Sequence, residues 1–355
     1  MDGENTSKRE NLLTLLDRKG GISEPIQSVA DYVRFVTDVA NEWQKEDWNS
    51  DSQNEDYALN TASIVGRIWF RGQRTCHRSL RPRLYREATW QLLKREESAP
   101  FRTGDDCDTD DPLFEDLFEL EHEMRIDFTN YGHLLNELNQ AKTPIDWYFL
   151  MQHHSVPTRL LDWTTNALAA LFFAVEGYGK QLEDRQEASC TASASGGGAQ
   201  DCVAVWATDA YWLADQLSDD WSAPLLPYSE DAAKYVPPLE NLIESERLND
   251  ARRLLPKHPM PIEPPAMHPR VAAQEGRFLI FGRPADLLDQ KIRLRQSDHC
   301  EEEQLRLKQI IFKVQGYDIV MRELARLGVS RRTLFPDLAG LADFVRWKHF
   351  HRVNA

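Results

Sequence analysis

Three short stretches of the chain place polar side chains where the surrounding sequence is apolar. The first is Trp69-Phe70-Arg71-Gly72-Gln73, at the end of a β-rich run. A buried guanidinium needs a carboxylate or phosphate partner, so Arg71 is expected to bind an anionic ligand or to pair with a structural acid such as Asp162. Gly72 would let a ligand approach the backbone closely.

The second stretch, from Trp147 to Ala174, is dense in polar residues of many types. They stand between two apolar segments of helical character, so several should converge on one place. Asp162 or Thr164 would cap a helix beginning at Ala167, and the N–H groups of that helix end could bind an anion. Capping alone would also explain either residue. The polar residues of this stretch include Gln152, His153, His154, Thr158, Arg159, Asp162, Thr164 and Asn166.

The adjacent residues His153 and His154 raise the question of a metal site. Neighbouring side chains usually point apart, and no third residue lies at a spacing typical of metal ligands. We therefore expect no metal there. Either histidine could instead move a proton, although the sequence indicates no partner for it.

The third stretch runs from Pro269 to Phe278. Arg270 and Gln274 bracket small residues that lead into a predicted strand. A surface turn before a strand would explain this spacing equally well.

The elements around these stretches predict an α+β fold, with one domain that contains a mixed, split β-sheet flanked by helices. A helix should begin at Ser28, with Asp31 completing a weak capping box. Residues 156–165 are expected to form a turn broken by Pro157. Strands are predicted over 63–73, 203–208, 276–281 and 305–314, and further helices over 111–135, 145–152, 167–176, near 239–254, over 319–327 and over 336–350.

Composition narrows the class of protein. The 355 residues carry a formal net charge of -15, which gives no general attraction for nucleic acid. The start of the chain resembles no signal peptide, and the longest apolar stretch, Ala167 to Val175, is too short to cross a bilayer. The five cysteines include no CxxC pair, so neither a disulfide framework nor a zinc site is indicated. We therefore expect a cytoplasmic protein with no membrane partner.

Taken together, the motifs resemble the FRG domain, named for Phe-Arg-Gly. The resemblance runs from about Ser28 to Phe350, with Ser155-Val156 as a departure from the family's usual Gly-containing or aromatic pair. Composition predicts a flexible polar arm over residues 1–25 and a mobile, Ser/Gly/Ala-rich loop near 181–200, so the FRG domain would extend over 26–355. The segments that carry it are FRGQ at 70–73, LRPRLYR at 80–86, QHHSVPTRLLDWT at 152–164, ALFFA at 170–174, RVAAQEGRF at 270–278 and LFPDLAGL at 334–341.

The motif layout is also similar to that of ADP-ribosyltransferases, and this similarity implies a fold of that type with NAD as the substrate. It implies an NAD-cleaving or ADP-ribosylating effector, in phage defence or a toxin–antitoxin setting. The alternative is a non-catalytic module that binds a nucleotide or a protein. The implied catalytic residues are Arg71, Asp162, Gln274 and Glu275, and the implied cofactor-binding residues are Arg71, Gly72, Gln73, His153, Thr158, Arg159 and Thr164.

Overall fold

The structure is a computed structural model of the chain. It describes residues 28–50, 66–75, 80–86, 112–133, 135, 141–176, 202–218, 221–238, 245–265, 268–283, 306–313 and 317–350. The arm predicted over residues 1–25 and the loop predicted near 181–200 lie outside these residues.

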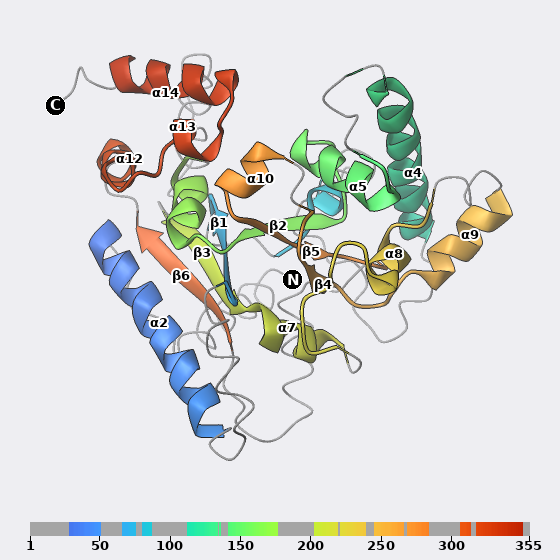
Figure 1. The fold of residues 1–355 in the computed structure, drawn as a ribbon, viewed down its shortest axis with the longest axis horizontal. Helices are drawn as coiled ribbons and strands as arrows, with labels where there is room; N and C mark the ends of the chain where they lie inside the picture. The colour runs from blue at the N-terminus through green and yellow to red at the C-terminus, as the bar shows by residue number, and fades with distance from the viewer. Residues whose placement is uncertain are drawn as a thin grey trace, which may run out of the picture.

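A six-stranded sheet of order β4-β5-β2-β1-β3-β6 forms the centre of the fold (Figure 1). The chain therefore has the predicted α+β class. Every pairing between these strands is antiparallel, whereas we expected a mixed sheet. Most of the strands are joined by long connections, which allow parallel and antiparallel pairing alike. The sequence alone therefore does not determine the strand directions. The strands are β1 (Ile68–Gln73), β2 (Leu160–Thr164), β3 (Cys202–Asp209), β4 (Met260–Ile262), β5 (Gly276–Ile280) and β6 (Leu307–Lys313).

The sheet splays between β1 and β2. Strand β1 follows β3 along its whole length, from Ile68↔Asp209 to Gln73↔Ala204. It meets β2 only at Phe70↔Thr164. The sheet is thus split into a β4-β5-β2 half and a β1-β3-β6 half, in line with the predicted split.

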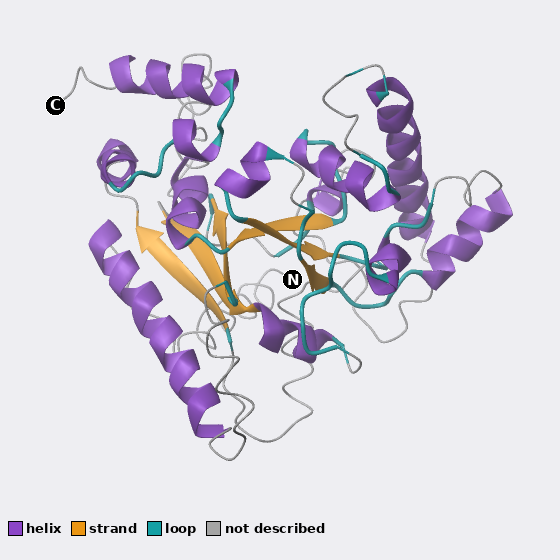
Figure 2. Cartoon of the chain, viewed as in Figure 1, coloured by secondary structure: helices purple, strands orange, loops and turns teal. Residues whose placement is uncertain are grey.

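Helices surround the sheet, as the cartoon in Figure 2 shows. Helix α2 runs beside β6, and α10 lies between α5 and the C-terminal helices α13 and α14 (Figure 1). The helices are α2 (Val29–Ser50), α4 (Pro112–Gly132), α5 (Pro144–His153), a helix over 167–176, α7 (Ala210–Leu217), α8 (Glu230–Tyr235), α9 (Ser245–Leu254), α10 (Pro269–Ala273), α12 (Tyr317–Arg326), α13 (Arg331–Leu334) and α14 (Leu338–Phe350).

Local chemistry explains several of these boundaries. The predicted cap of α2 is present, because Ser28 Oγ accepts the Asp31 N–H at 3.1 Å and donates to the Asp31 carboxylate. Helix α5 begins with a reciprocal capping box between Thr143 and Asp146. Asp337 Oδ1 accepts the Gly340 N–H, so the last helix begins at Leu338, slightly later than predicted.

Two sequence predictions need correction. The predicted turn at 156–165 contains β2, a central strand, because burial of four of its five residues outweighs the turn signal of Pro157. Residues 217–269, where we predicted only a helix near 239–254, also contain α8 and β4.

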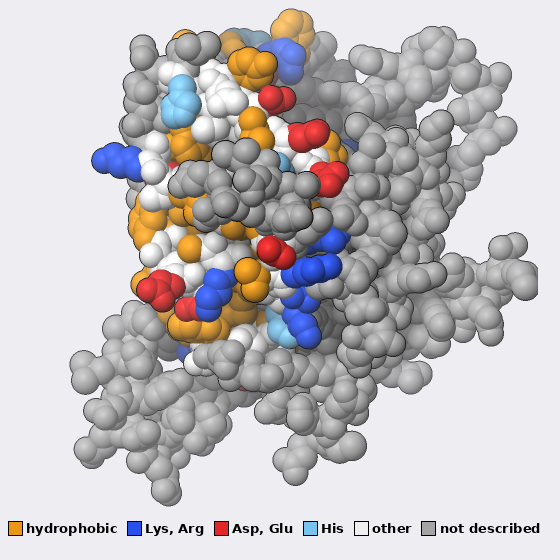
Figure 3. Space-filling model, turned by 90° about the vertical axis from the view of Figure 1, so that its right-hand side faces the viewer, with side chains coloured by type: hydrophobic (Ala, Val, Ile, Leu, Met, Phe, Trp, Pro, Cys, Tyr) orange, Lys and Arg blue, Asp and Glu red, His pale blue; other side chains and the backbone are white. Residues whose placement is uncertain are grey.

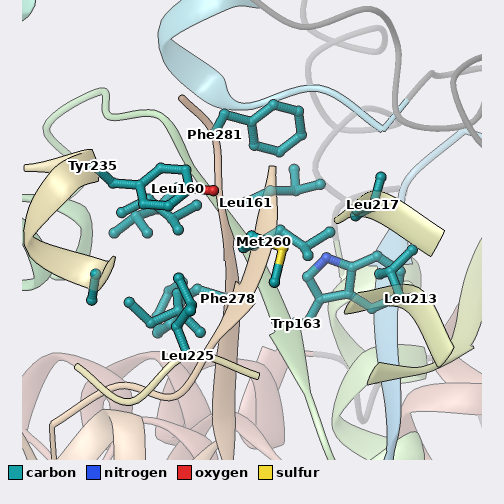
Figure 4. Close-up of a cluster of buried hydrophobic side chains, with 14 of the residues drawn as sticks. Leu160, Leu161, Trp163, Leu213, Leu217, Leu225, Tyr235, Met260, Phe278 and Phe281 are labelled. Atoms are coloured by element: carbon teal, nitrogen blue, oxygen red, sulfur yellow. The ribbon is translucent and has the colours of Figure 1, made fainter. Parts of the chain in front are cut away.

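Two hydrophobic clusters stabilise the sheet. The larger one, shown in Figure 4, packs Leu160, Leu161 and Trp163 of β2 against Met260, Phe278 and Phe281 and the side chains of α7. The second one packs α2, the 167–176 helix and α12 against β1, β3 and β6. None of the helices within the described residues is long and apolar enough to span a membrane.

Candidate functional site

Arg71 and Asp162 meet where β1 and β2 diverge. Arg71 Nη1 donates to the main-chain oxygen of Asp162 at 2.5 Å and lies 3.6 Å from its Oδ2. The Arg71 side chain is 11% exposed and that of Asp162 is 59% exposed. Burial lowers the pKa of Arg71, and the nearby Asp162 carboxylate opposes that shift. The pairing that the sequence suggested is therefore present, with its acidic member open to solvent.

Two polar side chains hold the Asp162 carboxylate in place. Gln152 Nε2 donates to Asp162 Oδ1 at 2.6 Å. Gln152 Oε1 accepts from Thr158 Oγ1 at 2.6 Å, and this hydroxyl accepts the Leu160 N–H in turn. Because each group in this chain has a partner, the amide of Gln152 is fixed in one orientation. Thr158 is fully buried and acts on Asp162 only through Gln152.

Glu275 belongs to a second network at the N-terminal end of the 167–176 helix. Its carboxylate accepts from Thr165 Oγ1 at 2.8 Å and from Asn166 Nδ2 at 3.4 Å. Glu275 has a φ of 48°, which is unusual for a residue with a side chain. Such a backbone persists only when its surroundings hold it, and strained residues of this kind cluster at functional sites.

Thr164 and Gln274 connect this second network to the sheet and to the C-terminal segment. Thr164 Oγ1 donates to the Gln274 main-chain oxygen at 2.6 Å and accepts the Asn166 N–H. The Gln274 side chain turns away and donates to the main-chain oxygen of Leu334 at 3.0 Å. Contrary to our expectation for Asp162 or Thr164, Asn166 caps the 167–176 helix by accepting the Ala169 N–H, because the chain is still a strand up to Thr164.

The strand register sets the separation of the two networks. Thr164 pairs with Phe70 of β1 and with Gly276 of β5. Arg71 follows Phe70, and Glu275 precedes Gly276, so the two lie on opposite flanks of β2. With strands about 4.8 Å apart, their backbones are on the order of 10 Å from each other. Asp162 thus lies beside Arg71, and Glu275 lies on the other flank of β2, beyond Thr164.

Arg159 does not join either network. It is 1% exposed, and its Nε donates to Glu121 at 2.8 Å. Its other nitrogens donate to the main-chain oxygens of Phe281, Gly282 and Tyr235. Burial alone would lower the pKa of Arg159, but Glu121 and nearby tyrosines raise it. The predicted cofactor-binding role is therefore replaced by a structural one, because the side chain enters the core.

Glu121, the partner of Arg159, escaped the sequence analysis. Its other carboxylate oxygen accepts the hydroxyl of Tyr148, which in turn accepts the Arg159 N–H. Burial raises the pKa of Tyr148. Helix α4 contains several acids at similar spacing, so no local signal distinguishes the buried one.

Gly72 and Gln73 also have partners within the protein. A Cβ at Gly72 would stand 2.0 Å from the Ala170 main-chain oxygen, so the glycine is needed where β1 packs on the 167–176 helix. We had expected a ligand in that space. Gln73 is buried, and its Oε1 accepts from Trp206 Nε1 at 2.9 Å.

His153 stacks against His268, the residue before α10, with ring centroids 3.6 Å apart. Burial lowers the pKa of His153 to about 3, and His268, His154 and Arg270 add to the effect. Arg270 itself pairs with Asp337. Among the described residues, no group of three histidine, cysteine, aspartate or glutamate side chains has the geometry of a metal site.

Charge on the surface shown in Figure 3 is mixed, with acidic, basic and hydrophobic side chains of the described residues lying among one another.

Residues 66–183 match the FRG domain. The FRG match contains Arg71, Gln152, Thr158 and Asp162, whereas Gln274 and Glu275 lie outside it. No curated protein and no solved structure matches the chain significantly.

Proposed function

We propose that the chain binds NAD or a related dinucleotide at Arg71 and cleaves the bond between nicotinamide and ribose. The observation that carries this proposal is the Arg71–Asp162 pair, a largely buried guanidinium beside an exposed carboxylate. Arg71 Nε is buried without a hydrogen-bond partner among the described residues, so the guanidinium keeps unused donor capacity. A phosphate could use that capacity in a charge-assisted, bidentate contact.

Asp162 can give way to such a ligand. Its carboxylate lies 3.6 Å from Arg71 Nη1, which is long for a charge-assisted bond, and Gln152 holds its other oxygen. A diphosphate at Arg71 would replace this weak contact. The main-chain bond from Arg71 to Asp162 would keep the guanidinium in place.

Glu275 supplies the carboxylate that the reaction needs. When the glycosidic bond breaks, nicotinamide leaves with the bonding electron pair and positive charge develops on the ribose carbon. A fixed carboxylate stabilises that charge, and water or an acceptor hydroxyl then attacks the carbon and loses a proton. Thr165 and Asn166 fix the carboxylate of Glu275 before any ligand binds. In a cell this activity would consume NAD, which suits the phage-defence or toxin–antitoxin settings that the resemblance implies.

The test is nicotinamide release from NAD, measured together with NAD binding by calorimetry. Glu275→Gln should lose turnover and keep NAD binding, because the negative charge is needed mainly in the transition state. Arg71→Lys should lose both. Glu263→Gln is a suitable control, because Glu263 lies just beyond the end of β4 and belongs to neither network. Wild-type protein that binds no NAD would disprove the proposal.

A non-catalytic nucleotide-binding module is the second candidate. It is favoured by the hydrogen bonds of Glu275, since both carboxylate oxygens already have partners within the chain. In that case the wild-type protein would bind NAD without releasing nicotinamide, and Glu275→Gln would change neither measurement.

A further inference from the structure

Three histidines form a contiguous cluster of rings where the end of α5 meets the start of α10. His153 and His154 end α5, and His268 precedes α10. The ring centroids are 3.6 Å apart for His153 and His268, 5.0 Å for His153 and His154, and 6.2 Å for His154 and His268. We call these three residues the imidazole cluster.

The imidazole cluster lies on the same chain segments as the two polar networks. Its residue His153 directly follows Gln152, which holds the Asp162 carboxylate. Its residue His268 begins the segment that ends at Gln274 and Glu275. The cluster therefore begins one residue away from a group that contacts Asp162.

The chemistry of the cluster suits an aromatic ring better than a phosphate. His268 Nδ1 accepts the Arg270 N–H, so this nitrogen is already used within the chain. The low pKa of His153 keeps that ring neutral near pH 7. Neutral imidazoles lack the charge that binds phosphate, but their faces stack on heterocycles. His154 is exposed and His268 is half-buried, so both are accessible.

We infer that the imidazole cluster is the stacking surface for the nucleobase of the nucleotide ligand. The inference rests on the proposed function, because it takes a nucleotide as the ligand of Arg71. The phosphate is held by the guanidinium, and the base lies against the rings of His154 and His268. A ligand without a base gains nothing from this surface.

The experiment compares two probes by calorimetry, adenosine monophosphate and inorganic pyrophosphate. His154→Ala should weaken binding of the monophosphate about tenfold and leave pyrophosphate binding unchanged. His154→Phe keeps an aromatic ring and should retain the affinity for the monophosphate. His133→Ala is the matched control, since His133 is also exposed and contacts Trp147 outside the cluster, with ring centroids 4.9 Å apart.

The outcomes separate the two proposals. Equal affinity of the wild type and His154→Ala for the monophosphate would overturn the stacking surface and leave Arg71 as a phosphate site. Loss of pyrophosphate binding in His154→Ala would also overturn it, because the histidine would then bind the phosphate. If the wild type binds neither probe, the proposed function fails and the stacking surface fails with it.

Discussion

Arg71 contacts Asp162 twice, through the main-chain oxygen at 2.5 Å and through the carboxylate at 3.6 Å. Continued antiparallel pairing of β1 and β2 would place Gly72 opposite Asp162, yet the register contains only Phe70↔Thr164. The arginine side chain therefore takes the place of the missing backbone ladder. The same guanidinium serves both the sheet and the proposed ligand, and mutation can separate these two roles.

Arg71→Lys should abolish ligand binding while lowering the melting temperature by only a few degrees. A lysine retains the charge and can still donate to the Asp162 main-chain oxygen, but it cannot bind a phosphate through a planar fork. Calorimetry with NAD and thermal unfolding of the same samples give both values. If Arg71 is only structural, the variant should bind NAD as the wild type does and change only in melting temperature.

Glu121→Gln should destabilise the fold by about 3–5 kcal/mol, because it leaves the guanidinium of Arg159 buried without its negative partner. Urea unfolding measures this free energy. Glu123→Gln, on the solvent-facing side of α4, is the control and should stay within about 0.5 kcal/mol of the wild type, since Glu123 is exposed. Equal effects of the two changes would contradict the structural role of Glu121.

Gly72→Ala should destabilise the protein by about 1–3 kcal/mol or more, as overpacked cores do. The new Cβ would stand 2.0 Å from the Ala170 main-chain oxygen and 2.7 Å from the Ala174 nitrogen, so the 167–176 helix would have to move. Thermal unfolding is the direct measurement. An unchanged melting temperature would show that the helix does not pack on β1 as closely as the structure has it.

Acidification should weaken the fold through His153. Its pKa is about 3 in the folded protein against about 6.5 in the unfolded chain, so the unfolded state takes up the proton first. The stability that the neutral ring provides is therefore complete above pH 6.5 and decreases as the pH falls from 6.5 towards 3. The groups that face the ring are His154, His268, Arg270 and Asp337, and only Asp337 favours the charged form.

The measurement is urea unfolding at pH 7 and pH 5.5 for the wild type and for His153→Asn. The variant should lose less stability between these two pH values, because the titrating ring is gone. An identical loss in both proteins would assign the pH dependence to other groups.

Site residues could be predicted from the sequence where neighbouring residues carry the signal. An arginine at the end of an apolar strand requires an anionic partner, which we expected to be either a ligand or an acid such as Asp162. The structure pairs Arg71 with Asp162. Strand β2 was missed because it has only five residues, follows Pro157 and buries four of the five, so it lacks the alternation typical of a strand.

Other features depend on contacts between distant segments. The close approach of Gly72 to Ala170 and the stacking of His153 on His268 each join residues far apart in the chain, and no local pattern encodes them. The same holds for Arg159, whose burial depends on Glu121 in another helix. Polar residues in one motif were therefore assigned to one site, although the alternating directions of a strand send them to different places.

The splay between β1 and β2 makes the site a mechanically weak junction between the two halves of the sheet. Across it the two halves of the sheet share one backbone register pair, and the side chain of Arg71 supplies a further link. Pulling the ends of these two strands apart would load that arginine before the long ladder between β1 and β3. A dinucleotide that contacted both Arg71 and Glu275 would link the two halves of the sheet. A bound ligand would therefore increase the force needed to separate them.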